Sequence, residues 1–284
     1  MLSSMLIGLL CAAFAAILYG LTSVLQAIAV RRLPDPGDGL WPLAKALVTD
    51  VAMVLVVVIG LIGWGLHLVA IKYLPLYLVQ AVIAASLVVT AVTSVLYLRE
   101  RLTPRHWAAA AAACGGLALL ALASGDAGHG QFTTNKTVAL YVGAVAITLA
   151  GLVAVRRPEP AGGIALAWLS GLAYAGIPLA TRALTESDWD VSTLLAAATV
   201  GLYGLLGFWL YSVALQRITA TASTAPLVLA ETVVPAILGV VWLGDNIRQG
   251  WAVVAVAGLV ISLVGVLGLA DVQTIDDPAL APPS

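Results

Sequence analysis

The chain alternates between long apolar runs and short polar segments. A helix needs about 20 consecutive apolar residues to cross the hydrocarbon core of a bilayer. Nine runs reach that length, and charged or turn-forming residues separate most of them. The pattern predicts an all-α, polytopic membrane bundle of nine transmembrane helices, at residues 6–30, 51–73, 77–98, 105–125, 136–155, 162–183, 191–215, 220–243 and 250–270.

Three segments need separate assignment. Residues 40–50 fit either an interfacial lead-in or an extension of the second helix, because they hold Trp41, Pro42 and Lys45. The first run has no basic start and no small-residue cleavage site, so we interpret it as a retained helix rather than a signal peptide. The tail, 271–284, combines acidic residues with prolines and is predicted to be disordered.

Composition supports a membrane protein and excludes several other classes. Hydrophobic residue types make up 62% of the 284 residues and charged types 10%, with a mean hydropathy of +1.06. Soluble domains are about 25% charged. The net charge of −1 and the lack of a basic tract exclude a nucleic-acid binder. Cys11 and Cys114 lie far apart in apolar runs, which favours buried apolar side chains over a disulfide or metal site.

The positive charges predict the orientation. Nine of the 13 lysine and arginine residues fall in the loops after the first, third, fifth and seventh helices, and four fall on the other side. Positively charged loops remain in the cytoplasm. We therefore expect the N-terminus outside and the C-terminus in the cytoplasm. The excess of arginine over lysine and the abundant alanine suggest a bacterial plasma (inner) membrane as the location.

Two parts of the chain resemble each other at an offset of 144–145 residues. Residues 69–74 align with 213–218, residues 88–101 align with 233–246, and Trp107 aligns with Trp251. A weaker match relates Tyr19 to Tyr174. Helices two to four therefore correspond to helices seven to nine.

A single helix between the two copies would turn the second copy upside down. This predicts a 4+1+4 arrangement: a first repeat in 1–125, a linker helix in 126–160, an inverted second repeat in 161–270 and the cytoplasmic tail. Inverted repeats recur in secondary transporters, with the solute near the midplane at the repeat interface. The alternative is a duplicated membrane protein that does not transport.

Two motifs carry a family resemblance. One is Leu98-Arg99-Glu100-Arg101-Leu102, followed by a small-residue helix that begins near Trp107, and the other is Leu243-Gly244-Asp245. With these motifs the chain resembles the EamA-like proteins of the drug/metabolite transporter superfamily. Its helix count and residues 74–102 are most similar to the NIPA-type magnesium transporter branch. The resemblance implies a transporter bundle rather than an enzyme.

One departure from the NIPA-type branch concerns the ion. That branch carries an acidic residue and an asparagine where this chain has Trp64 and His67. Magnesium prefers oxygen ligands. The resemblance therefore extends to the fold and does not extend to the ion.

Glu231 is the only acidic residue deep within a predicted span. A charge at the centre of a membrane helix costs about 2.5–3.5 kcal/mol on insertion scales, so such a residue faces a cavity or a partner. One interpretation is proton coupling or solute binding, and the other is a protonated side chain that bonds a neighbouring helix. Pro235, one turn later, frees the carbonyl of Glu231 and is a candidate hinge or a packing kink.

Further polar residues in the spans are candidates for the same pocket. His67 can titrate near neutral pH, and its repeat mate is Tyr211. Uncharged hydrogen-bonding side chains in spans more often join helices. Together with Glu231 they would line a pocket for a small polar or amphipathic solute, and the remaining candidates are Tyr19, Gln26, Gln80, Tyr174 and Tyr203.

Other features are assigned to structure. Asp50 is a candidate cap for the second helix. Glu100, between Arg99 and Arg101, is interpreted as part of a cytoplasmic ion-pair cluster. Small residues allow close helix approach, namely Gly201, Gly204 and Gly207 in the seventh helix and the alanines at 108–113 in the fourth.

These observations predict a secondary transporter of a small polar or amphipathic solute, with Glu231 as the proton- or solute-linked carboxylate. No enzyme motif, nucleotide-binding loop or metal-ligand spacing is present in the sequence, so we expect no catalysis, cofactor or resident metal. The alternatives are a magnesium-like divalent-cation transporter, a flippase for lipid-linked substrates and a non-transporting scaffold subunit. The expected partners are the bilayer and the solute, with a homodimer or a partner subunit left open.

Overall fold

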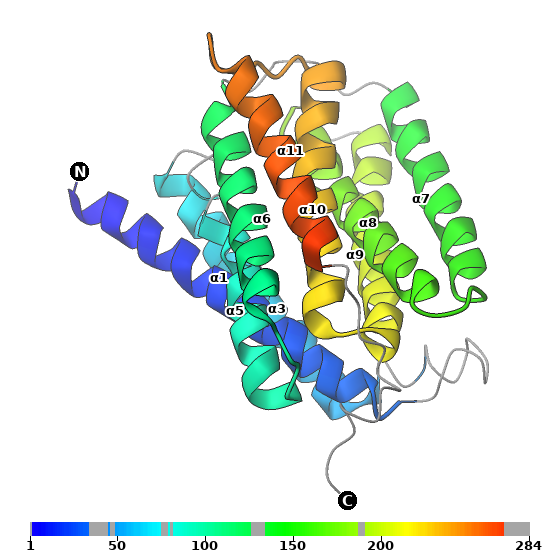
Figure 1. Cartoon of the computed structure of the whole chain (residues 1–284). Helices are drawn as coiled ribbons and strands as arrows, with labels where there is room; N and C mark the ends of the chain where they lie inside the picture. Colours follow the sequence, from blue (N-terminus) through cyan, green and yellow to red (C-terminus); the bar gives the residue numbers. More distant parts are fainter. Residues whose placement is uncertain are drawn as a thin grey trace, which may run out of the picture.

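The fold is described from a computed structural model of the whole chain (Figure 1). The structure describes residues 2–33, 49–74, 82–125, 134–186 and 191–269, together with residues 45 and 79. Within these ranges every regular element is a helix, which confirms the all-α class. Most of segment 40–50, Gln80 and the tail 271–284 lie outside the described residues.

Eight described helices are long and apolar enough to cross a membrane, and each coincides with a predicted span. An apolar run in lipid must pair its backbone groups internally, and a helix does so within one segment. The helices are α1 (Leu2–Val30), α3 (Val51–Tyr73), α6 (Pro104–Ala123), α7 (Thr134–Ala154), α8 (Ala161–Glu186), α9 (Val191–Arg217), α10 (Ala220–Leu238) and α11 (Ala252–Leu269).

The third predicted span is shorter than its hydropathy indicates. It contains α5 (Ser86–Thr93) and the π-helix η2 (Ser94–Leu98), and the apolar helical stretch that can be described begins only at Val82. The start of the predicted run 77–98 lies mostly outside the described residues. The described residues thus hold eight full-length spans and one shorter apolar helix, rather than nine full spans.

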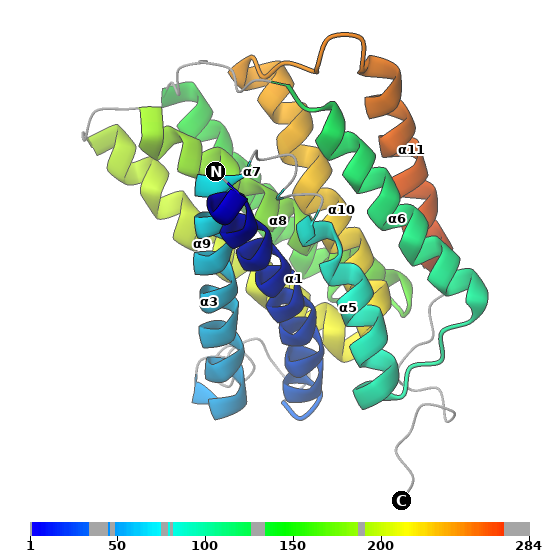
Figure 2. The ribbon, with the colours of Figure 1, turned by 90° about the vertical axis from the view of Figure 1, so that its left-hand side faces the viewer.

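The helices are arranged as pairs around α10. Helix α6 packs along α11, α8 along α9, and α1 along α3 (Figure 1, Figure 2). Helix α10 contacts members of all three pairs and α5, and residues 220–230 are all buried. Helix α3 packs mainly on α1, whereas α7 packs on α8 and α9. Large apolar side chains such as Leu205 and Val253 are exposed around the outside, as expected of surfaces that face lipid.

Small residues bring α6 and α11 into backbone contact. A methyl group at Gly116 would collide with the backbone of Ser262, and one at Gly265 would collide with the backbone of Ala113. Close approach of this kind is a main source of packing energy between helices in lipid. The predicted role of the alanines in this helix agrees with the contact.

The glycines of α9 differ from one another in their surroundings. A methyl group at Gly207 would lie 3.0 Å from the ring of Tyr174, so this glycine does permit a close helix contact. At Gly204 the nearest atom would be 3.9 Å away, and Gly201 faces open space. The predicted three-residue contact surface is therefore reduced to Gly207.

Helices α6 and α11 run antiparallel. The amide of Gly125, just after α6, donates to the carbonyl of Asn246 at 2.8 Å. The amide of Arg248, just before α11, donates to the carbonyl of Ala123 at 2.9 Å. The end of one helix therefore lies beside the start of the other.

Three of the helices, α3, α6 and α10, begin at a residue whose side chain caps the first free amides. Asp50 accepts a bond from the amide of Met53, which confirms its predicted cap of α3. Thr103 caps α6 through the amide of His106, and Thr219 caps α10. Only two residues separate α9 from α10, so the weakest boundary in the hydropathy is a tight, capped turn.

Two π-helices occupy matching places in the two halves. Helix η2 ends at Arg99, whose φ is 57°, and η3 (Gly239–Leu243) ends at Gly244, whose φ is 72°. In both, the residue after this left-handed position donates its amide to the first residue of the π-helix. Glu100 and Asp245 therefore occupy equivalent backbone positions, 145 residues apart.

Candidate functional site

Glu231 lies midway along the central helix α10 and is exposed. It is eleven residues, or about 16 Å, from the start of α10. The eleven preceding residues of α10 are all buried, whereas Glu231 is exposed. A carboxylate at this depth needs water or a polar partner, because its charge is costly in hydrocarbon.

Three tyrosines from three helices lie close enough to this carboxylate to interact with it electrostatically. Glu231 interacts electrostatically with Tyr19 of α1, Tyr174 of α8 and Tyr211 of α9. Tyr211 is buried, and the other two are partly buried. The sequence placed all four residues in one candidate pocket, and the structure brings them together. We call Tyr19, Tyr174 and Tyr211 the tyrosine cluster.

The first half of the cluster is held by α3. The ring of His67 meets the ring of Tyr19 edge to face, with centroids 6.3 Å apart and an interplanar angle of 77°. A methyl group at Gly63 would lie 3.1 Å from the same tyrosine ring. Nε2 of His67 is buried and has no hydrogen-bond partner among the described residues. His67 therefore belongs to the surroundings of Glu231 through Tyr19.

The second half repeats this arrangement on α8 and α9. The ring of Tyr174 packs against Gly207 as that of Tyr19 packs against Gly63. Tyr211, the repeat mate of His67, interacts electrostatically with Tyr174. Its hydroxyl shares a 2.6 Å hydrogen bond with Thr224 of α10. The two aromatic groups thus approach Glu231 from equivalent helices.

Two of the other candidates form hydrogen bonds between helices, and a third lies within a continuous helix. Gln26 is buried and donates to the hydroxyl of Ser212 at 2.9 Å, which joins α1 to α9. Tyr203 donates to the carbonyl of Leu140 at 2.6 Å, which joins α9 to α7. Pro235 lies within α10, which continues to Leu238. Gln80 lies outside the described residues.

The charge at the site is unbalanced toward the negative. Within the described spans, the lysine and arginine residues and His106 lie within two residues of a span end. At greater depth, the titratable groups besides Glu231 are phenols, His67 and the thiols of Cys11 and Cys114. No cluster of three or more acidic, histidine or cysteine side chains that could hold a metal is found among the described residues. One carboxylate beside phenol rings can take up a proton or bind a single positive group, the latter aided by the ring faces.

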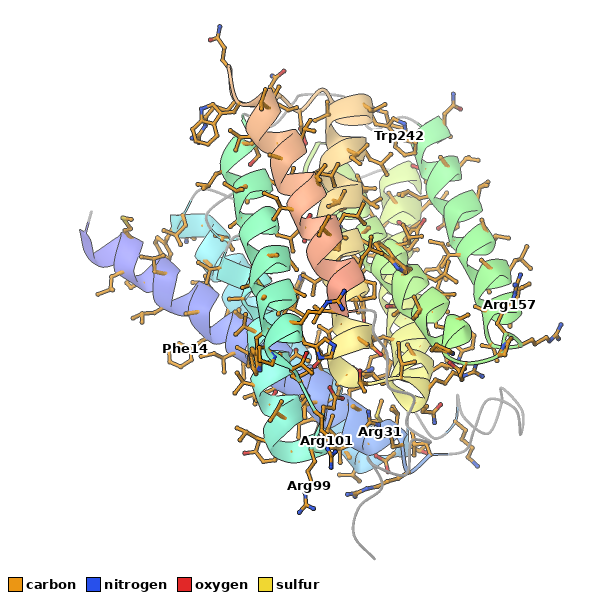
Figure 3. The ribbon with its side chains drawn as sticks, in the orientation of Figure 1. Phe14, Arg31, Arg99, Arg101, Arg157 and Trp242 are labelled. Atoms are coloured by element: carbon orange, nitrogen blue, oxygen red, sulfur yellow. The ribbon has the colours of Figure 1, made fainter. Side chains whose placement is uncertain are left out.

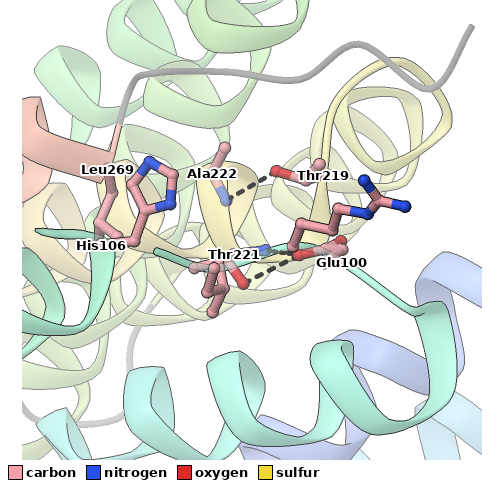
Figure 4. Close-up of a pocket in the computed structure, with 8 residues that line it drawn as sticks. Glu100, His106, Thr219, Thr221, Ala222 and Leu269 are labelled. Carbon is pink, nitrogen blue, oxygen red and sulfur yellow. Dashed lines mark hydrogen bonds between the residues drawn. The ribbon is translucent and has the colours of Figure 1, made fainter. Parts of the chain in front are cut away.

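A second polar site lies at the start of α10, near Arg31, Arg99 and Arg101 (Figure 3). We call this end of the bundle the Glu100 end, and the opposite end, with the labelled Trp242, the Trp242 end. The side chain of Glu100 is 4% exposed. Its carboxylate accepts a hydrogen bond from the amide of Ala220 at 2.6 Å. It also accepts from the amide of Thr221 at 3.3 Å and from the Thr221 hydroxyl at 3.0 Å (Figure 4).

This geometry corrects the interpretation of Glu100 as a member of a surface cluster with Arg99 and Arg101. The carboxylate binds the start of a helix, where free amides and the helix dipole favour a negative charge. Its ion-pair partner is Arg31, at 3.8 Å. Burial lowers the pKa of Arg31, and the charge of Glu100 partly offsets this effect.

A small cavity adjoins Glu100 (Figure 4). Its volume is about 20 Å³, close to what one water molecule needs. His106 lines its other side, where Nδ1 accepts the amide of Thr103. The cavity is too small for a solute, so the interactions of Glu100 connect helices rather than form a transport site.

Sequence reasoning missed this role of Glu100 because its partners are not local. Ala220 and Thr221 lie about 120 residues away, and no hydropathy pattern links them to Glu100. The available signal was the repeat, which aligns an acidic residue after each π-helix. An acidic residue kept at both places indicates a role of that position in the fold.

Comparison with known proteins adds one family match. Residues 37–122 match the EamA-like transporter family. No curated protein and no solved structure matches the chain. The matched segment includes α3, α5, η2 and nearly all of α6. This part of the chain is therefore similar to a family of membrane transporters of the drug/metabolite superfamily, which are not enzymes.

Proposed function

We propose that the protein is a secondary membrane transporter of the drug/metabolite type, with Glu231 as the residue that binds the proton or the solute. The observation that carries the proposal is the accessible carboxylate of Glu231, deep in the central helix and beside the tyrosine cluster. A costly charge at the midplane of a bundle is most simply explained by transport. The family match of residues 37–122 supports the same class.

We infer a 4+1+4 inverted repeat, with 1–125 and 161–270 as the repeats and 126–160 as the linker. The antiparallel course of α6 and α11 supports the inversion, because the repeat makes these two helices equivalents. The pairs Tyr19–Gly63 and Tyr174–Gly207 support the same correspondence. Such a repeat allows alternating access around a fixed central site.

The solute that best fits this site is small and carries one positive charge. The lysine and arginine residues within the described spans, Arg105, Lys136 and Arg217, all lie within two residues of a span end, whereas Glu231 lies midway along its helix. Phenol rings favour organic cations such as ammonium groups. Magnesium usually keeps several waters and is bound through one or two carboxylates together with phosphate oxygens of a substrate. A single carboxylate therefore favours an organic cation over the NIPA-type ion.

We further propose that the Glu100 end faces the cytoplasm in a bacterial plasma membrane. This orientation follows from the distribution of lysine and arginine. Arg31, Arg99 and Arg101 all lie at that end (Figure 3). The N-terminus would then lie outside, and the C-terminus in the cytoplasm.

The test uses proteoliposomes that contain a trapped pH indicator. Small ammonium compounds, amino acids, magnesium and amphipathic metabolites are added outside, and solute-driven proton flux is recorded. We expect Glu231→Gln to abolish the flux, because an amide cannot exchange a proton. Glu231→Asp keeps a carboxylate and should retain a measurable part of the flux.

The outcomes separate the alternatives. An unchanged flux in Glu231→Gln would remove Glu231 from the mechanism. A response to magnesium alone would favour the divalent-cation transporter, and movement of labelled lipid without solute flux would favour the flippase. A folded protein that moves none of these compounds would favour the scaffold subunit.

A further inference from the structure

The turn between η2 and α6 carries three exposed arginines, Arg99, Arg101 and Arg105, which we call the arginine turn. None of the three side chains forms a hydrogen bond or an ion pair with a described residue. Glu100 is the only acidic residue between positions 51 and 125, and its carboxylate is buried against the start of α10. No described acidic side chain therefore balances the positive charge on the outside of this turn.

Arg99 occupies a backbone conformation that favours glycine. Its φ is 57°, in the left-handed region that residues with a Cβ atom rarely adopt. Its counterpart after η3 is Gly244, and the counterpart of Arg101 is Asn246, so the shared backbone does not require a cation at either position. An arginine that served only to add charge would fit better at another exposed position. The location of Arg99 therefore indicates a role for its side chain at this point.

An apolar surface leads up to the arginine turn. Leu96 and Tyr97 of η2 are 68% and 69% exposed, and Val92 of α5 is exposed as well. Trp107, near the start of α6, is also exposed. Tyrosine and tryptophan are typical of the boundary between hydrocarbon and lipid headgroups. The arginine turn therefore lies at the end of an apolar helical stretch, at the level expected for headgroups.

The charge and the spacing of the arginines fit a phosphate group. Consecutive Cα atoms are 3.8 Å apart, so those of Arg99 and Arg101 are at most about 7.6 Å apart, and both side chains can reach one anion. Both residues lie at the same end of the bundle (Figure 3). Guanidinium groups bind phosphate oxygens through paired hydrogen bonds. A free phosphate would use only the arginines, whereas a phospholipid would also use the apolar surface beside them.

We propose that the arginine turn and the adjoining apolar surface bind an anionic phospholipid in the leaflet at the Glu100 end. Arg99 and Arg101 bind the phosphate, and one acyl chain packs along Leu96 and Tyr97. The site requires only that the protein spans a bilayer, so it does not depend on the proposed transport.

The test measures lipid binding by native mass spectrometry. The full chain in a neutral detergent is titrated separately with palmitoyl-oleoyl phosphatidylglycerol, which is anionic, and with palmitoyl-oleoyl phosphatidylcholine, which has the same acyl chains and no net charge. We expect the wild-type protein to retain phosphatidylglycerol more tightly. Arg99→Gln together with Arg101→Gln should weaken this binding by about fivefold for each arginine, the typical effect of one basic residue near an anionic surface.

The matched control removes the same amount of charge elsewhere. Arg156→Gln together with Arg157→Gln changes two exposed arginines after α7, and it should leave the affinity for phosphatidylglycerol within twofold of wild type. An equal loss in the two double variants would indicate diffuse attraction to positive charge and would overturn the site. Equal binding of the two lipids by the wild-type protein would overturn it as well.

Glycerol 3-phosphate separates a lipid site from a site for a small anion, because it carries the phosphate and no acyl chain. We expect it to leave phosphatidylglycerol bound when it is added at a tenfold excess over the lipid. Displacement of the lipid would show that the acyl chain contributes nothing, which would contradict the proposal.

Arg99→Gly shows whether a loss of binding reflects a folding defect. Glycine fits a φ of 57°, so the lipid-free variant should unfold at the same temperature as wild type or at a higher one. It should nevertheless bind phosphatidylglycerol about fivefold more weakly. Full affinity in this variant would exclude Arg99 from the site and reject the proposal. None of these measurements uses a solute, so their failure would leave the proposed role of Glu231 unchanged.

Discussion

Tyr174 and Tyr19 take their positions from glycines on neighbouring helices. Gly207 and Gly63 leave room for the rings, and any larger residue would push the phenols away. Both tyrosines interact with Glu231, so these glycines determine how the phenol groups surround the carboxylate. Two residues without side chains thereby shape the proposed binding site.

Gly207→Ala tests this effect at the residue scale. The new methyl group would lie 3.0–3.1 Å from the ring of Tyr174, which forces the ring to shift by a few tenths of an ångström. We expect solute-driven proton flux to fall by about 10-fold, since small misplacements of binding groups cost this much or more. Gly204→Ala, with its nearest neighbour at 3.9 Å, should retain normal flux. Equal losses in both variants would contradict the proposal.

Single residues differed in how well the sequence predicted them. The sequence analysis expected one pocket to contain Glu231, Tyr19, Tyr174 and Tyr211, because polar side chains in apolar spans tend to form hydrogen bonds with one another. The role of Gln26 as a bond between helices was one of the stated alternatives. Glu100 was misinterpreted because its neighbours in sequence are arginines, whereas its partners in space are the first amides of α10.

Among the elements, α6 and α11 make the closest contact. Gly116, Gly258 and Gly265 bring the two backbones together along their length. Helices that touch in this way cannot be separated slightly without losing many contacts at once. We therefore regard this pair as a rigid frame beside α10.

Gly116→Ala tests the frame. Its methyl group would meet the backbone of α11, which cannot yield, so we expect a loss of about 1–3 kcal/mol in stability. Gly115→Ala is the matched control on the adjacent position, where nothing lies within 4 Å. It should be neutral or stabilising by up to about 1 kcal/mol, because alanine favours a helix. Thermal unfolding in detergent measures both, and similar unfolding temperatures would refute the contact.

The sequence predicted the positions of the long helices well, but it did not predict that two segments would be π-helices. Runs of apolar residues between polar loops fixed the eight long helices, since a spanning segment has no alternative to a helix. Hydropathy contains no information on hydrogen-bond register, so the two π-helices were not foreseen. The left-handed residue that ends each of them is Arg99 in one half and Gly244 in the other, and only the glycine signals such a turn.

At the scale of the whole molecule, the paired helices form two similar groups around α10. The packing of α1 on α3 resembles that of α8 on α9, which supports the proposed repeat. The correspondence was visible in sequence because the offset is constant over three helices. The side-chain contacts between the groups could not be predicted, because they join residues 120 to 186 positions apart in the sequence.

Helix α7 packs on only one of the two groups of helices, so the two groups differ in size. It packs on α8 and α9, and the Tyr203 hydroxyl of α9 donates a hydrogen bond to the Leu140 carbonyl of α7. Helix α3, in contrast, packs mainly on α1. Under the proposed transport cycle, we expect α1 and α3 to move together and α7, α8 and α9 to keep their mutual arrangement. The contact between His67 and Tyr19 would then be kept while both residues change their distance from the second group of helices.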